Sequence, residues 1–224
     1  MTWLERHPIR TDSKSIALLA IFTAMVVSLE VFPIPGITDI GPPGGFTIDW
    51  TGIPIVIVFL GLGFVYSLVA IAAMWMAIAY RNFTGAAFKG FAELYTIVGL
   101  IIAKIVMMRY QLDRKTRILL YLIFGSLFRA IGMFITNIYL LQVLYGLNPE
   151  AAVIGSAAYG GLNILQAIIN IVGGVVLYYL IPENLALQAG LGDDAVSASS
   201  RVEELPLEEI ESSQPDDPVI GGQG

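Results

Sequence analysis

Four polar side chains recur along one otherwise apolar stretch near the end of the chain: Tyr159, Asn163, Gln166 and Asn170. Their spacing of i, i+4, i+7 and i+11 places all of them on one face of a helix. An amide or phenol group that faces lipid has no hydrogen-bond partner, so this face should turn towards protein, a cavity or a ligand. Hydrogen bonding between helices is the structural alternative. We interpret the face as a binding face, because four polar residues in register exceed what helix contacts usually need.

Glu93 is a further candidate, because it is a carboxylate within a predicted helix over 88–109. It shares a stripe of that helix with Lys89 and Thr96. An ionisable side chain inside a membrane span is a candidate functional group by default, since its burial is costly. The structural alternative is an ion pair with Lys89, which lies one helical turn away.

A predicted helix over 117–145 carries Arg129 and Asn137. Arg129 follows Arg117 by 12 residues, which places it about 18 Å along the helix at 1.5 Å per residue. At that depth the guanidinium must face the bundle interior and find an acceptor. Structural pairing and contact with a bound molecule both remain open for Arg129. Asn137 lies nearer the outer surface and is the better candidate for ligand contact.

Several kinds of chemistry lack the residues that they require. The chain has no cysteine, which excludes disulfides, thiolate metal sites and cysteine nucleophiles, and its one histidine, His7, lies outside the apolar runs. No metal site, catalytic triad or bound cofactor is therefore expected. The chain also lacks the G-x-x-x-x-G-K-[ST] loop that cradles phosphates. We expect a non-catalytic protein that binds a small molecule and does not itself hydrolyse ATP.

The apolar runs that must position these residues are long enough to cross a membrane. Hydrophobic residues make up 56% of the chain and charged residues 13%, and a run of about 18 apolar residues can span a bilayer. The runs over 15–32 and 152–181 each predict one helix. The run over 53–80 is interrupted by Gly61 and Gly63, so it reads either as one long helix or as a short helix followed by a longer one.

The distribution of basic residues decides between these two alternatives. If the run forms two helices, eight basic residues share one side of the membrane: Arg6, Arg10, Lys14, Lys104, Arg109, Arg114, Lys115 and Arg117. Only Arg81 and Lys89 then lie on the other side, whereas a single helix would put five on each. Because cytoplasmic segments carry the excess of Lys and Arg, we favour two helices. The predicted fold is an all-α membrane protein of the cell membrane, a six-transmembrane-helix bundle with a short second helix and both termini cytoplasmic.

The chain divides into three regions. Residues 1–14 form a polar cytoplasmic segment, residues 15–182 the membrane domain and residues 183–224 an acidic tail. Nine of the 18 acidic residues lie between Asp193 and Asp217, and the tail is rich in Ser, Gly and Pro. Such a segment buries too little apolar surface to fold alone, so we expect it to be disordered in the cytoplasm.

The loop between the first two predicted helices is rich in Pro and Gly, and it contains Phe46, Asp49 and Trp50. We include these three residues in the predicted substrate-binding site. The two aromatic rings are suited to stack on a flat ligand ring, a contact worth about 1 kcal/mol beyond the area that it buries.

The first helix carries small residues on one face, at Ala17, Ala20 and Ala24. The Ala20-x-x-x-Ala24 spacing permits the close approach of another helix. That helix belongs either to this bundle or to a partner protein, and the spacing alone does not distinguish them.

Four segments, in order along the chain, resemble motifs of the substrate-binding S components of energy-coupling factor (ECF) vitamin transporters, and of the riboflavin type in particular. Residues 46–54 resemble F-x-I-D-F-S-D-[IL]-P, residues 90–94 resemble G-E-L-A-N, residues 136–146 resemble L-N-Y-F…P-L-Y-G and residues 163–167 resemble N-L-I-K-G. The likeness covers about 15–181. The chain departs from the motifs at Gln166, where the family has lysine, and at 63–64, where Gly-Phe replaces Gly-Pro.

This resemblance implies a subunit of an ABC importer that captures a vitamin, with riboflavin as first choice, from outside the cell. It implies a transmembrane coupling subunit and two ATPase subunits as partners, with the alanine face of the first helix as docking surface and the loop over 33–52 as a lid. The lipid bilayer is the other partner, and no nucleic acid is expected. The alternatives are an S component for a different vitamin, an intramembrane enzyme that uses Glu93 or Asp49, and a membrane scaffold.

Overall fold

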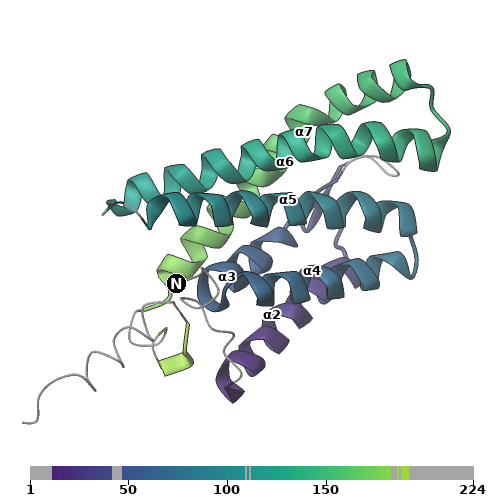
Figure 1. The fold of residues 1–224 in the computed structure, drawn as a ribbon. Helices are drawn as coiled ribbons and strands as arrows, with labels where there is room; N and C mark the ends of the chain where they lie inside the picture. Colours follow the sequence, from purple (N-terminus) through teal and green to yellow (C-terminus); the bar gives the residue numbers. More distant parts are fainter. Residues whose placement is uncertain are drawn as a thin grey trace, which may run out of the picture.

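The computed structural model describes residues 12–41, 47–108, 110, 112–182, 186 and 188–191. In these ranges the chain is mostly helical (Figure 1), with helices α2 (Ser13–Val31), α3 (Gly52–Leu62), α4 (Phe64–Ala79), α5 (Phe83–Met107), α6 (Arg114–Tyr145) and α7 (Pro149–Leu180). A short antiparallel hairpin, β1 (Asp39–Ile40) and β2 (Ile48–Asp49), lies between α2 and α3. The predicted helical fold is thereby confirmed.

Four of the described helices, α2, α5, α6 and α7, are long and apolar enough to cross a membrane. α3 and α4 have 11 and 16 residues and fall short of the ~20 residues that a perpendicular span requires. Gly63 separates them with a φ of 98°, a left-handed conformation that glycine adopts without steric cost. The predicted division of the run over 53–80 is confirmed, whereas the number of spans and the side on which the termini lie stay predictions.

Polar caps set where four of the helices begin. The caps are Asp12 for α2, Asn82 for α5, Asp113 for α6 and Asn148 for α7, and each side chain accepts a hydrogen bond from a backbone N–H in the first turn. The helices α5 and α6 therefore begin at Phe83 and Arg114, before the predicted positions 88 and 117. The difference arises because the cap precedes the apolar pattern from which those positions were predicted.

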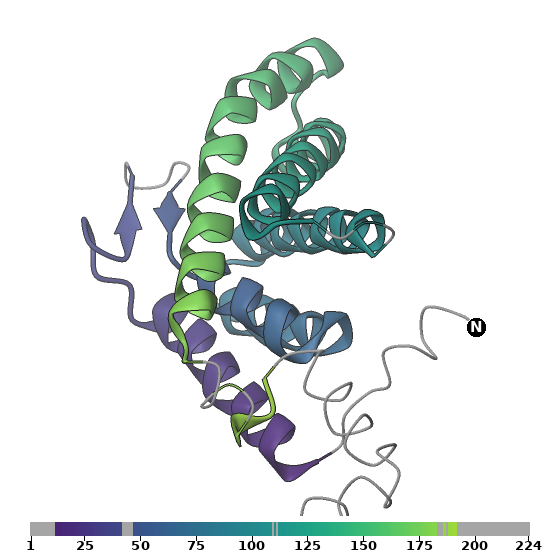
Figure 2. The ribbon, with the colours of Figure 1, turned by 90° about the vertical axis from the view of Figure 1, so that its left-hand side faces the viewer.

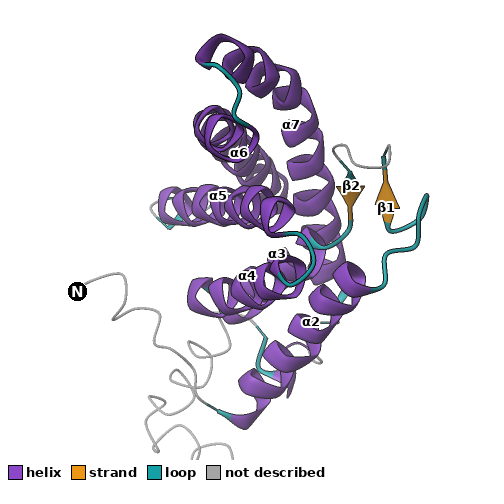
Figure 3. Ribbon diagram, turned by 90° about the vertical axis from the view of Figure 1, so that its right-hand side faces the viewer, coloured by secondary structure: helices purple, strands orange, loops and turns teal. Residues whose placement is uncertain are grey.

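The helices are arranged so that α5 lies between α4 and α6, while α7 packs against both α6 and the short helix α3. Figures 2 and 3, which view the molecule from opposite sides, both place α7 between α6 and the hairpin. Strand β2 contacts α7 directly. The hairpin and the start of α3 are thus brought to the polar face of α7.

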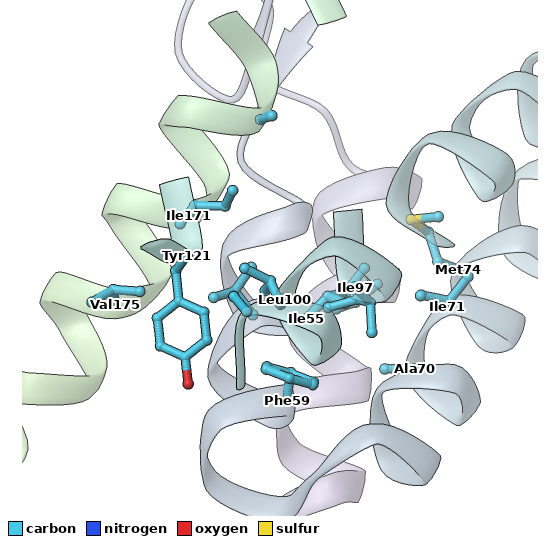
Figure 4. Packing of buried hydrophobic residues seen from close by; sticks show 14 of the residues in the cluster. Ile55, Phe59, Ala70, Ile71, Met74, Ile97, Leu100, Tyr121, Ile171 and Val175 are labelled. Atoms are coloured by element: carbon cyan, nitrogen blue, oxygen red, sulfur yellow. The ribbon is translucent and has the colours of Figure 1, made fainter. Parts of the chain in front are cut away.

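The hydrophobic core surrounds α3, in which Ile55 and Val58 have no exposed surface. In Figure 4, Ile55 and Phe59 of α3 lie close to Leu100 of α5 and Tyr121 of α6. The rings of Phe59 and Tyr121 meet edge to face, with their centroids 6.5 Å apart. A helix that is apolar on every side belongs in the interior of a bundle, and this burial fixes the position of the N-terminus of α3.

The chain returns to the bundle after α7. Leu191 is only 5% exposed and packs near Leu62 and Tyr66. The Lys14 ammonium donates a hydrogen bond of 3.0 Å to the carbonyl oxygen of Gln188, which ties this segment to the start of α2. The rest of the acidic tail, for which disorder is predicted, lies outside the described residues, as do the first 11 residues of the chain.

Candidate functional site

The residues predicted for the site differ in burial. Six of them are buried: Asp49, Glu93, Asn137, Asn163, Gln166 and Asn170. Trp50 and Tyr159 are 43% and 37% exposed, so they lie at the margin of the buried cluster. Phe46 lies outside the described residues. The polar face of α7 therefore faces the interior from Asn163 to Asn170, as its spacing predicts.

Glu93 of α5 and Arg129 of α6 form a buried ion pair, with Arg129 Nη1 2.7 Å from Glu93 Oε1. The same nitrogen donates to Thr96 Oγ1 at 3.1 Å, and Asn170 Nδ2 of α7 donates to Glu93 Oε1 at 3.0 Å. Buried charges are tolerated when they are paired in this way. Arg129 thus has a structural partner, and the alternative pairing of Glu93 with Lys89 does not occur.

The N-terminus of α3 approaches this ion pair closely. A Cβ atom added to Gly52 would lie 1.9 Å from Asn170 Nδ2 and 2.8 Å from Glu93 Oε2, so a larger residue would displace the polar side chains. A negative charge near a helix N-terminus is stabilised by the helix dipole and by the unpaired N–H groups of the first turn. The carboxylate of Glu93 therefore lies where α3, α5, α6 and α7 meet.

Gln166 connects α7 to the hairpin. Its Oε1 accepts a hydrogen bond from the backbone N–H of Asp49 at 3.1 Å, and its Nε2 donates to the carbonyl oxygen of Asp49 at 2.7 Å. Nε2 also donates to Asn170 Oδ1 at 2.9 Å. Through Gln166 and Asn170 the hairpin is joined to the Glu93–Arg129 pair by a continuous chain of buried hydrogen bonds.

A second ionic cluster joins the hairpin to α2 and α5. Lys89 Nζ lies 2.9 Å from Asp49 Oδ2 and also pairs with Glu30 of α2. Thr51 Oγ1 donates to Glu30 Oε1 at 2.7 Å. Glu30 is not among the residues predicted for the site. It is the one acidic residue in the apolar run over 15–32, and this isolated charge is the sequence feature that could have identified it. In the described part of the chain, no group of three or more His, Cys, Asp or Glu side chains is placed to hold a metal ion.

The charge state of Asp49 follows from this cluster. Burial by itself raises the pKa of the Asp49 carboxyl, but the charge of Lys89 and the hydrogen bonds from Lys89 and Thr51 outweigh burial, so the pKa lies below its usual value of 3.8. A lowered folded-state pKa contributes stability above the unfolded-state pKa and loses it as the pH falls through the folded-state value. The Asp49–Lys89 pair is therefore fully formed at neutral pH.

Two amide oxygens on neighbouring helices are buried without a hydrogen-bond partner, Asn137 Oδ1 of α6 and Asn163 Oδ1 of α7. The Nδ2 group of Asn163 is already used, because it donates to the carbonyl oxygen of Tyr159 at 3.0 Å. A buried acceptor that lacks a donor costs about 1–3 kcal/mol, so each of these oxygens would be stabilised by a donor from a bound molecule. Glu93 Oε2 and Arg129 Nε also lack partners.

These two amides lie at one level of the bundle. Asn137 follows Arg129 by eight residues and Asn163 precedes Asn170 by seven, which correspond to about 12 Å and about 10 Å along a helix. Figure 1 shows that α6 and α7 run in opposite directions. These sequence offsets therefore place both amides on the same side of the Glu93–Arg129 pair. The bundle therefore contains one level with a paired charge and a second level, about two to three helical turns away, with two unpaired acceptors.

Ala17, Ala20 and Ala24 lie on an exposed face of α2. Ile16 and Ile21, which are 53% and 58% exposed, extend the same apolar surface. The other side of α2 packs against α3 and α4. The alternative in which the three alanines pack within this bundle is therefore wrong for the described chain, and their surface is free to meet lipid or another protein.

Comparison with solved structures finds a similarity to a protein described as the S-component for biotin from an ECF-type ABC transporter. The identity is 18%, the TM-score is 0.48, and the aligned region covers 80% of this chain and 95% of that chain. No protein-family model and no curated protein matches the chain. A TM-score of this size does not establish a shared fold.

Proposed function

We propose that the chain is the substrate-binding membrane subunit of an ECF-type ABC importer, which captures a vitamin-like small molecule from outside the cell. The four motif-like segments support this function, because they occur in order over most of the helical region. The observation that carries the proposal is the pair of buried, unpaired amide oxygens of Asn137 and Asn163, one on each of two neighbouring helices. A transmembrane coupling subunit and two ATPase subunits would supply the energy for uptake, since the chain has no phosphate-binding loop.

The proposed ligand site lies between α6 and α7, in the outer half of the membrane, with the Glu93–Arg129 pair as its inner limit. Unpaired carbonyl oxygens accept hydrogen bonds, so the ligand presents N–H or O–H donors to Asn137 and Asn163. Trp50 and Phe46 are proposed to cover a flat ring from the loop side. Riboflavin has both a flat ring with an N–H group and a hydroxyl chain, and it is our first choice; a different vitamin with the same features is the alternative.

An intramembrane enzyme is less well supported, because both candidate carboxylates are engaged in ion pairs. Glu93 binds Arg129 and Asn170, and Asp49 binds Lys89. A carboxylate held in an ion pair is not free to take a proton from a substrate, because its counter-ion would then be buried without a partner. A binding role for the cluster therefore has more support than a catalytic one.

The proposal is tested by purifying the protein in a mild detergent and identifying the small molecules that remain bound by mass spectrometry. A flavin would also colour the preparation yellow. Recovery of a stoichiometric vitamin is expected, whereas a preparation that carries no small molecule and binds none of the vitamins offered to it would contradict the proposal.

The amide oxygens give a residue-level prediction. Asn137→Ala and Asn163→Ala are each expected to weaken ligand binding by about 1–3 kcal/mol, because ligand donors then remain unpaired. Equilibrium binding measured on the purified variants checks this, with Gln142→Ala as the matched control, since the side chain of Gln142 donates to the Ile138 carbonyl oxygen of its own helix. Wild-type affinity in both asparagine variants would contradict the proposed position of the site.

The proposed topology has six helices across the membrane and both termini in the cytoplasm. A cysteine placed at Lys115, in an otherwise cysteine-free chain, is expected to be shielded from a membrane-impermeant maleimide in intact cells. A cysteine placed at Leu147, between α6 and α7, is expected to react and serves as the control. Reaction of Lys115→Cys from outside, without lysis, would rule out this orientation.

A further inference from the structure

Gln166 uses its polar atoms on the protein itself. Oε1 accepts from Asp49 N, and Nε2 donates to Asp49 O and to Asn170 Oδ1. The side chain is 1% exposed. The amide thus pairs with the backbone of Asp49 as a neighbouring β-strand would, with one bond in each direction. Both N–H donors of Gln166 are occupied. The position of Gln166 on the polar face predicts contact with a ligand, but these bonds give it a structural role instead.

The same residue of the hairpin is held from a second side. The Asp49 carboxylate pairs with Lys89 of α5 and accepts a hydrogen bond of 2.9 Å from the N–H of Thr51. Within the hairpin, Asp49 is the register partner of Asp39, next to the pair Ile40–Ile48. The hairpin is only two residues deep on each strand, and a two-stranded ribbon of that size is not stable alone. Its attachment to the bundle therefore depends on Asp49.

We infer that Gln166 and Lys89 form a two-sided clamp on Asp49, and that Gln166 is a positioning residue that holds the hairpin against α7 and thereby slows release of the ligand. The role in ligand release rests on the proposed function. The clamp itself rests only on the hydrogen bonds and the ion pair of Asp49. An amide is required because the clamp needs a donor and an acceptor in one planar group. A lysine, which the resembling family has at this position, supplies donors only and cannot accept from the Asp49 N–H.

The clamp is tested on Gln166→Met, which at similar volume removes both bonds to Asp49 together with the bond to Asn170, and on Gln166→Glu, which keeps only the acceptor. Hydrogen–deuterium exchange of the peptide that contains Asp49 is measured on the full-length protein in detergent. Loss of both hydrogen bonds to Asp49 is expected to speed exchange of the Asp49 amide by about 10- to 100-fold in Gln166→Met. Gln166→Glu keeps an acceptor for that amide but places a carboxylate against the Asp49 carbonyl oxygen and Asn170 Oδ1, so it is expected to speed exchange as well. Gln142→Met is the matched control, and peptides of α3 should keep their protection in all variants, which separates local release from unfolding.

Ligand release is measured with riboflavin, whose dissociation from the protein after dilution is monitored by its fluorescence. Gln166→Met is expected to raise its dissociation rate by about tenfold, with no change in Gln142→Met. Unchanged exchange at Asp49 would overturn the clamp even if riboflavin binds. Faster exchange with an unchanged dissociation rate would overturn the positioning role. If the wild-type protein does not bind riboflavin, the proposed ligand is wrong, and exchange alone decides the clamp. If Gln166→Met fails to fold, Gln166→Glu gives both readings.

Discussion

Arg129→Ala is expected to lower the free energy of unfolding by about 3–5 kcal/mol, because it leaves a buried carboxylate without its counter-ion. Glu93 is 1% exposed, and Arg129 is the cation that its Oε1 contacts. The substitution also removes the donor to Thr96. Since the pair joins α5 and α6 next to the start of α3, the loss should affect the whole bundle rather than one helix end.

Thermal or denaturant unfolding in detergent, followed by tryptophan fluorescence, measures this effect. Lys115→Ala serves as the control, because Lys115 is an exposed basic residue on the same helix and changes of that kind usually stay within about 0.5 kcal/mol. The double variant Glu93→Gln with Arg129→Met removes both charges and should recover part of the loss. If Arg129→Ala is as stable as Lys115→Ala, the ion pair does not support the bundle.

Ala20→Trp is expected to abolish vitamin uptake by cells while the purified protein still binds its ligand. The reason is geometric: Ala17, Ala20 and Ala24 form an exposed apolar face of α2, and small residues on such a face let a partner helix approach closely. A tryptophan side chain would hold the proposed coupling subunit away from that face. The ligand site, which we place between α6 and α7, does not involve α2.

Uptake in cells and ligand binding to the isolated protein are measured side by side for this variant. Ile135→Trp is the control, because Ile135 is 63% exposed on α6 and a bulky residue there should meet only lipid. Full uptake by Ala20→Trp would place the docking surface elsewhere. Loss of binding as well as uptake would mean that the substitution disturbs the fold, and would remove the argument for docking.

The sequence alone determined the helical elements and the faces that they bury. Apolar runs of bilayer length predict the helices, since a long apolar segment must avoid water and satisfy its own backbone. The break at Gly63 was predictable for the same kind of local reason, because glycine adopts a positive φ that other residues avoid. The spacing of Asn163, Gln166 and Asn170 fixes a common face from the helical period, and the structure buries all three.

Only the tertiary structure decided which partner each buried polar side chain has. The helical period places Lys89 one turn from Glu93, yet Glu93 pairs with Arg129, 36 residues away, and Lys89 pairs with Glu30 and Asp49. Gln166 likewise bonds to Asp49, 117 residues away. A period relates residues on one helix, whereas these pairs depend on how separate helices cross and on where the hairpin rests. Burial then selects the pairing, since each charge or amide that leaves water must be matched by whichever group the packed helices bring within hydrogen-bond distance.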